Sequence, residues 1–93
     1  MRIALEIGFS FKWQLDEDDR SIEIPPKATV HDALEAIAVR HPQISARLFD
    51  ENGKIKRNIN ALINGGNVQW RRGFDTELKD GDRLTILPPM GGG

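Results

Sequence analysis

The last seven residues of the chain hold the group with the most distinctive potential chemistry. They read Leu-Pro-Pro-Met-Gly-Gly-Gly and end at Gly93. Proline has no backbone N–H, so Pro88 and Pro89 should stop strand pairing, and the glycines that follow, without Cβ atoms, should form a slim arm. The carboxylate at the tip of that arm is a poor electrophile until a partner activates it. We therefore expect a domain over residues 1–88 and a flexible tail over residues 89–93.

The composition narrows the classes of protein to which the chain can belong. Its 93 residues suit one small domain with a single core. It has no cysteine, which excludes disulfides, thiolate metal sites and catalytic thiols. Thirteen basic and 14 acidic residues give a net charge of −1, without the basic footprint of a nucleic-acid-binding protein. No apolar run is close to the length of a membrane-spanning helix, which is about 18 residues or more. The N-terminus does not show the pattern of a signal peptide, in which an apolar stretch follows positively charged residues. We expect a cytoplasmic protein without a membrane partner.

Alternating apolar residues predict a β-hairpin in the first third of the chain. One run begins near Met1 and a second halts at Pro25, with the acidic cluster 16–19 at the tip between them. The apolar positions are Ile3, Leu5, Ile7 and Phe9, then Phe11, Trp13 and Leu15, and finally Ile22 and Ile24.

A helix is predicted from Thr29 to about His41. The Thr29-x-x-Asp32 pattern is a helix-start signal, and Pro42 should end the helix. Between them, one apolar stripe recurs with helical spacing at Val30, Ala33, Leu34, Ile37 and Ala38. A second, short turn of helix over residues 44–49 would bury Leu48 and Phe49.

The second half of the chain predicts short strands separated by turns. Strands are expected over residues 59–63, 68–70 and 83–87, with a brief edge strand at 54–57 and a loop or single helical turn at 74–78. Turn residues occupy 50–53, 64–67 and 80–82. The helix must cover one face of a mixed sheet, and it supplies the crossover that would make the first and last strands parallel neighbours. The expected fold is therefore α+β, a β-grasp with four or five strands.

The closing segment resembles that of the MoaD/ThiS-type sulfur carriers. The resemblance lies in Phe74-Asp75-Thr76-x-Leu78-x-Asp80-Gly81-Asp82-x-Leu84-x-Ile86-Leu87-Pro88-Pro89-Met90-Gly91-Gly92-Gly93, together with Ile63-Asn64-Gly65 and the helix of residues 29–39. It implies the ubiquitin-like β-grasp fold, in a group that includes the molybdopterin synthase small subunit. The chain departs from the family in having Phe11-Lys12-Trp13-Gln14 near the first hairpin and in extending the terminal glycine run with Gly91.

The resemblance also implies a chemistry for the tail. An E1-like adenylating enzyme of the MoeB/ThiF type would use ATP to adenylate Gly93, and a cysteine desulfurase or rhodanese would supply the sulfur for a thiocarboxylate. The acceptor would be the molybdopterin synthase large subunit or another sulfur-accepting enzyme. Gly91 and Gly92 would give access to the partner's site. The chain itself would be a carrier rather than an enzyme, with no metal and no stably bound cofactor.

Leu62, Phe74 and Leu87 are candidates for a partner-binding patch at the root of the tail, continued by Pro88, Pro89 and Met90. If alternate residues of the last two strands face the core, Leu62 and Leu87 point outward, and exposed apolar patches commonly mark interaction sites. Phe74 belongs to the loop that leads into the last strand. Another candidate contact, Arg71-Arg72 beside Trp70, fits a solvated strand end or a protein contact better than a nucleic-acid site.

Three functions remain open on the sequence alone. The first is a sulfur carrier, for molybdopterin or for the thiolation of cysteine, thiamine or tRNA. The second is a ubiquitin-like modifier that is attached through Gly93 to lysines. The third is a β-grasp interaction domain with an inert tail, since frayed termini are common.

Overall fold

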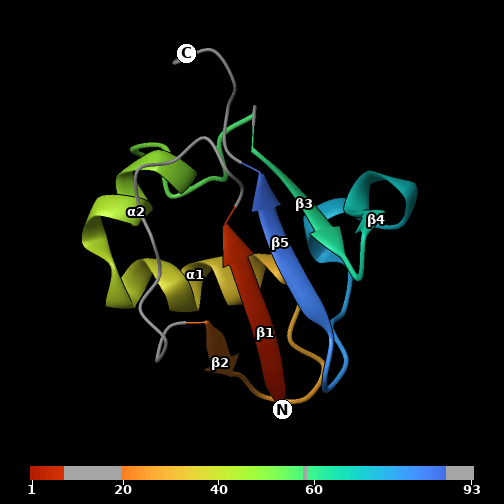
Figure 1. Cartoon of the computed structure of the whole chain (residues 1–93). Helices are drawn as coiled ribbons and strands as arrows, with labels where there is room; N and C mark the ends of the chain where they lie inside the picture. The colour runs from red at the N-terminus through yellow and green to blue at the C-terminus, as the bar shows by residue number, and fades with distance from the viewer. Residues whose placement is uncertain (8–19, 58, 88–93) are drawn as a thin grey trace.

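The computed structural model describes residues 1–7, 20–57 and 59–87 (Figure 1). Within these residues, five strands form one mixed sheet in the order β2-β1-β5-β3-β4. The predicted strand run from Phe9 to Leu15, its acidic tip and the tail after Leu87 lie outside the described residues. In the described part of the chain, no helix is both long and apolar enough to cross a membrane.

The first and last strands lie side by side at the centre of the sheet. β1 (Arg2–Ile7) pairs with β5 (Arg83–Leu87) in parallel. On its other side β5 pairs antiparallel with β3 (Asn60–Ile63). The outer strands are β2 (Ser21–Glu23), beside β1, and β4 (Gly66–Asn67), beside β3. The predicted β-grasp, with a parallel central pair, is confirmed.

The main helix, α1 (Val30–Arg40), begins where the sequence predicts. Thr29 Oγ1 accepts a hydrogen bond from the Asp32 N–H (3.2 Å), and the Asp32 carboxylate accepts one from the Thr29 N–H (2.9 Å). Together these bonds form a capping box, which satisfies donors that the first helical turn leaves unpaired. Pro42 ends α1 and at once begins a second helix, α2 (Pro42–Leu48), because proline is well suited to the first helical position.

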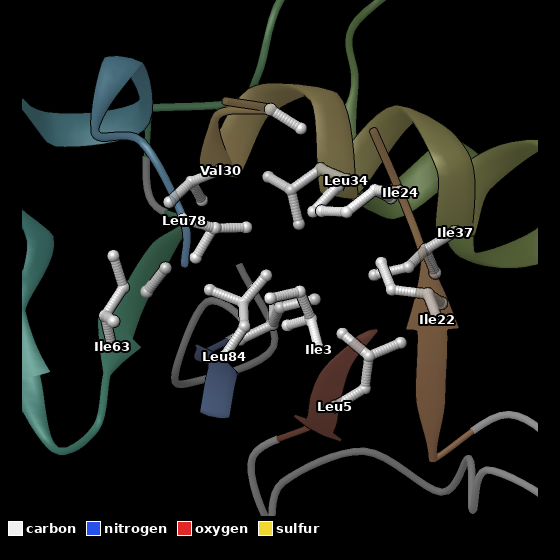
Figure 2. Packing of buried hydrophobic residues seen from close by; sticks show 14 of the residues in the cluster. Ile3, Leu5, Ile22, Ile24, Val30, Leu34, Ile37, Ile63, Leu78 and Leu84 are labelled. Carbon is white, nitrogen blue, oxygen red and sulfur yellow. The ribbon is translucent and has the colours of Figure 1, made fainter. Parts of the chain in front are cut away.

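α1 covers one face of the sheet with four of its five predicted stripe residues. Val30, Ala33, Leu34 and Ile37 are buried, whereas Ala38 is only half-buried. Figure 2 shows Val30, Leu34 and Ile37 of the helix packed with side chains of the strands. The labelled members of this core are Ile3, Leu5, Ile22, Ile24, Val30, Leu34, Ile37, Ile63, Leu78 and Leu84. Each fully buried aliphatic side chain contributes about 1.5–3 kcal/mol by leaving water.

The predicted strand at residues 68–70 is wrong. Val68–Trp70 is the 3₁₀ turn η2, and the strand that pairs with β3 is the preceding Gly66–Asn67. The Asn67 side chain accepts a hydrogen bond from the Gln69 N–H (2.8 Å) and so caps a turn at the point where the ladder would have continued.

Three smaller predictions have mixed outcomes. The single helical turn expected near residue 74 is present as η3 (Gly73–Asp75). The edge strand at 54–57 is reduced to one bridge, between Ile55 and Phe49. Leu48 is buried as predicted, but Phe49 is only half-buried, with its ring edge-to-face with His31.

Candidate functional site

The described chain ends at Leu87, on the central strand of the sheet. Figure 1 shows β5 in blue between β1 and β3. In the sequence, the predicted tail therefore follows a strand that is hydrogen-bonded to a neighbour on each side. The predicted site residues after Leu87 lie outside the described residues: Pro88, Pro89, Met90, Gly91, Gly92 and Gly93. The described part of the site is the end of β5 at Leu87 and the surface around it.

The opposite end of β5 is fixed to β1 by the Asp80-Gly81-Asp82 turn. The Gly81 N–H donates to the Arg2 carbonyl oxygen (2.9 Å), and the Arg2 N–H donates to the Asp80 carboxylate (2.8 Å). The Ala4 N–H donates to the Asp82 carbonyl oxygen (2.9 Å). Gly81 has φ of 86°, a conformation that residues with a Cβ adopt at a cost. The turn thus sets the register of the parallel central pair.

The same turn is fixed to β3 by Asn64. The Asn64 Nδ2 donates to Asp82 Oδ1 (2.9 Å), and Asn64 Oδ1 accepts from the Arg83 N–H (2.9 Å). The other carboxylate oxygen of Asp82 accepts from the Lys79 N–H (2.8 Å). Sequence reasoning noted the Asn-Gly and Asp-Gly-Asp motifs separately and missed this bond between them. The sequence did contain a signal for this bond, because the two turn motifs flank strands that were expected to be neighbours in the sheet.

Leu62 and Leu87 both face away from the helices, as predicted. Their chain neighbours Ala61, Ile63 and Ile86 are buried, while both leucines are half-buried. In the ladder Leu62 is opposite Thr85, and Leu87 is opposite Asn60. The two leucines are therefore diagonal neighbours on one face, at a typical separation of about 7–8 Å.

Phe74 does not join them. It is half-buried and packs against the core, which lies on the helix side of the sheet. The segment that follows runs along the entry to α1: the Val30 N–H donates to the Thr76 carbonyl oxygen (3.0 Å), and the Leu78 N–H donates to the Ala28 carbonyl oxygen (2.8 Å). These bonds hold η3 against α1, so the predicted three-residue patch is reduced to Leu62 and Leu87.

Two charged pairs lie elsewhere on the strands of the sheet. The Arg83 guanidinium lies 4.0 Å from the Glu6 carboxylate, and Arg2 donates to Glu23 at 3.0 Å. These side chains are well exposed, so each pair adds at most about 1 kcal/mol to stability. Among the described residues, no group of three or more His, Cys, Asp or Glu side chains is arranged to hold a metal ion.

The chain matches the model of the ThiS family over residues 9–93. It is 34% identical to small archaeal modifier protein 3 of Haloferax volcanii, over 90% of this chain and 80% of that protein. It is also 34% identical to the sulfur carrier protein CysO of Mycobacterium tuberculosis, over 70% of this chain and 72% of that protein. These relatives are named as modifiers and carriers, not enzymes, which agrees with the role predicted for this chain.

Solved structures of similar fold extend the comparison. The putative molybdopterin converting factor subunit 1 of Pyrococcus furiosus superposes with a TM-score of 0.70 at 30% identity, covering 96% of this chain and 98% of that one. The Amycolatopsis orientalis BexX/CysO complex gives a TM-score of 0.61 at 42% identity, covering 80% and 81% of the two chains. A relative of this chain thus occurs in a complex with another protein.

Proposed function

Because this chain belongs to the ThiS family, whose members among its relatives are ubiquitin-like carriers and modifiers, we propose that it carries sulfur as a thiocarboxylate at Gly93. The observation that carries the proposal is the position of β5. This strand is paired on both sides, is fixed at its start by Asn64 and Asp82, and is followed in the sequence by Pro-Pro-Met-Gly-Gly-Gly. Such a strand gives a partner a rigid body to hold while the tail enters its site.

The chemistry begins with an adenylating partner that binds ATP. The Gly93 carboxylate attacks the α-phosphorus of ATP, pyrophosphate leaves, and an acyl-adenylate forms. Hydrosulfide then attacks the acyl carbon and AMP leaves, which gives the thiocarboxylate. A persulfide donor, of the kind a cysteine desulfurase or rhodanese provides, gives an acyl disulfide in the same displacement, and a further thiol cleaves its S–S bond. ATP is consumed by the partner, in the cytoplasm, and this chain holds no cofactor of its own.

The contribution of the chain is access and position. Fully extended, residues 89–93 span at most about 17 Å, which sets the depth of the partner's site that the carboxylate reaches. Reacting atoms must approach to about 3–3.5 Å. A Cβ at Gly92 or Gly93 would widen the arm at its narrowest passage. Leu62 and Leu87 provide the apolar contact beside the root, with Pro88, Pro89 and Met90 extending it.

Two classes of reaction for the activated tail have support, sulfur transfer and attachment to lysines. Sulfur transfer to a molybdopterin synthase large subunit is supported by the likeness to the Pyrococcus converting factor, and a sulfur-carrier role in general by the likeness to the sulfur carrier protein CysO. Attachment to lysines is supported by the likeness to a Haloferax modifier protein. Both routes share the acyl-adenylate. They diverge when sulfide attacks the adenylate, or when a thiol of a partner first forms a thioester that a lysine amine then attacks. We place sulfur transfer to molybdopterin first and conjugation second.

The direct test is intact mass spectrometry after incubation with ATP, the adenylating enzyme of the same organism and sulfide. We expect the mass to rise by the difference between sulfur and oxygen. A chain that lacks residues 91–93 should not change in mass, and Gly92→Val should react slowly while it unfolds at the same denaturant concentration as the parent. If the parent chain gains no mass and forms no adenylate, the proposal fails. In cells, lysine conjugates lost on deletion of Gly93 would favour the modifier role.

A further inference from the structure

An exposed aromatic and basic surface lies beside β4. It consists of Trp70, Arg71 and Arg72 and is called the Trp-Arg surface below. Trp70 is 80% exposed, and both arginines are exposed. Within the described residues, neither guanidinium has a carboxylate at ion-pair distance, whereas Arg2 and Arg83 do. A large apolar ring exposed to water next to two exposed arginines suits a protein contact.

The backbone of this surface is firmly held. Val68, which begins η2, is fully buried. The Arg71 N–H donates to the Val68 carbonyl oxygen (2.9 Å), and the Arg72 N–H donates to the hydroxyl of Thr76 (3.1 Å), itself a buried residue. The backbone therefore needs little further ordering on binding, and a smaller share of the binding free energy is lost to entropy.

The Trp-Arg surface adjoins the outer face that carries the two leucines. Across the ladder, Leu62 is opposite Thr85 on β5 and opposite Asn67 on β4. Asn67 is the capping residue of η2, which contains Trp70. Figure 1 shows the helical turns after β4 at the β3–β4 edge of the sheet. A partner that covers Leu62 and Leu87 thus needs to extend across one short strand to reach the Trp-Arg surface.

We propose that the Trp-Arg surface is a second docking point for the adenylating partner, which meets it with carboxylates around an apolar pocket. The proposal rests on the proposed function and adds the chemistry of the partner's surface. Arginine binds carboxylates through paired N–H donors, and tryptophan and arginine are the residues that most often dominate interface energies. Guanidiniums at the edge of an interface also accelerate association with an acidic partner.

The surrounding charges favour a protein over a nucleic acid. Asp75 and Glu77 are exposed a few residues beyond Arg72, and the whole chain has a net charge of −1. Nucleic-acid affinity comes largely from neutralising many phosphates, and two arginines beside two carboxylates neutralise few. A protein partner needs only a few carboxylates opposite Arg71 and Arg72 and no continuous row of anionic groups past Asp75 and Glu77.

The test is a steady-state adenylation assay in which the concentration of this chain is varied. The rate is measured from the release of pyrophosphate. For the R71E/R72E variant we expect KM to rise about tenfold with kcat within about twofold, because the tail and the reacting atoms are unchanged. The R71K/R72K variant should lie between this variant and the parent. Trp70→Ala should raise KM by a similar factor. Added salt should weaken binding of the parent more than binding of R71E/R72E.

A matched control separates local docking from net charge. K27E/K54E makes the same change in net charge at two exposed positions outside the Trp-Arg surface, and its KM should stay within about twofold of the parent value, since distant exposed charges are screened. Circular dichroism and urea unfolding should show that all variants are folded.

The outcomes distinguish the two proposals. If the parent chain is not adenylated at all, the proposed function fails and the docking proposal fails with it. If the parent is adenylated and R71E/R72E has the parent's KM and salt dependence, only the docking proposal is overturned. It is also overturned if KM is unchanged while poly(U) quenches a tryptophan fluorescence component that Trp70→Phe removes, because that result assigns the surface to RNA.

Discussion

The side-chain amide of Asn64 donates a 2.9 Å hydrogen bond to the carboxylate of Asp82, 18 residues further along the chain. This bond joins the end of β3 to the turn that starts β5. The same turn receives a backbone bond from β1, so one carboxylate-bearing turn sets the register of three strands. The face that Leu87 presents depends on that register, because a slip of one residue exchanges the two faces of a strand.

Replacing Asn64 tests this clamp. Asn64 has φ of 52° and uses both side-chain polar atoms, so Asn64→Ala loses two hydrogen bonds and adds strain. We expect a loss of about 1–3 kcal/mol in the free energy of unfolding. Asn64→Gly loses the same bonds without the strain and should be less destabilising. Urea unfolding measures both, and an unchanged midpoint for Asn64→Ala would contradict the assignment.

Much of this fold follows from local patterns in the sequence. The last strand, Arg83–Leu87, has the predicted bounds, and the capping box at Thr29 starts α1 where the pattern places it. Both signals are local: an alternation that ends at proline, and a cap that precedes an apolar stripe. They also suffice to orient Leu62 and Leu87, because the side-chain period of a strand fixes which residues share a face.

Two features of the structure differ from the predictions made from the sequence. Val68 and Trp70 alternate with Gln69 as in a strand, yet the side chain of Asn67 caps a 3₁₀ turn there. Phe74 packs on the core because the segment after it pairs with the residues that precede α1, at the Thr29–Glu77 bridge. The first outcome depends on a side-chain hydrogen bond between residues two apart, which competes with the strand that the alternation indicates. The second depends on a tertiary contact, which no window of neighbouring residues contains.

The capping box makes a second stability prediction. Thr29→Ala removes the acceptor for the Asp32 N–H and should cost about 1 kcal/mol of unfolding free energy. Thr29→Ser keeps a hydroxyl in the same position and should cost much less. Thermal unfolding at neutral pH compares the two variants. Equal destabilisation by alanine and serine would mean that the methyl group of Thr29, rather than its hydroxyl, carries the effect.

Asp50 predicts a pH dependence. The hydrogen bond from the Lys54 N–H to its carboxylate, aided by a second from the Asn52 N–H, holds the pKa of Asp50 below its ordinary value. A carboxyl whose pKa is lowered on folding stabilises the fold above its unfolded pKa of about 3.9 and loses that contribution as the pH falls through the folded pKa.

The matched variant is Asp50→Asn, which keeps an oxygen acceptor but does not titrate. The parent should be more stable than Asp50→Asn at pH 7, and the difference should shrink as the pH falls below about 4. Urea unfolding of both proteins across that range measures the difference. A difference that stays constant into acid would show that the charge of Asp50 contributes nothing to folding.

Leu62 and Ile63 separate binding from folding at adjacent positions of one strand. Ile63 is 1% exposed in the core, so Ile63→Ser should cost about 2–5 kcal/mol of unfolding free energy. Leu62 is half-buried on the outer face, and Leu62→Ser should cost about 1 kcal/mol or less of unfolding free energy.

In the adenylation assay, Leu62→Ser should raise KM with kcat preserved, because the tail is intact and only the docking surface is altered. Urea unfolding and adenylation kinetics on the same preparations give both quantities. If the Leu62→Ser variant has the parent's KM, Leu62 does not contact the partner. Docking beside the tail would then depend on Leu87 and the residues that follow it.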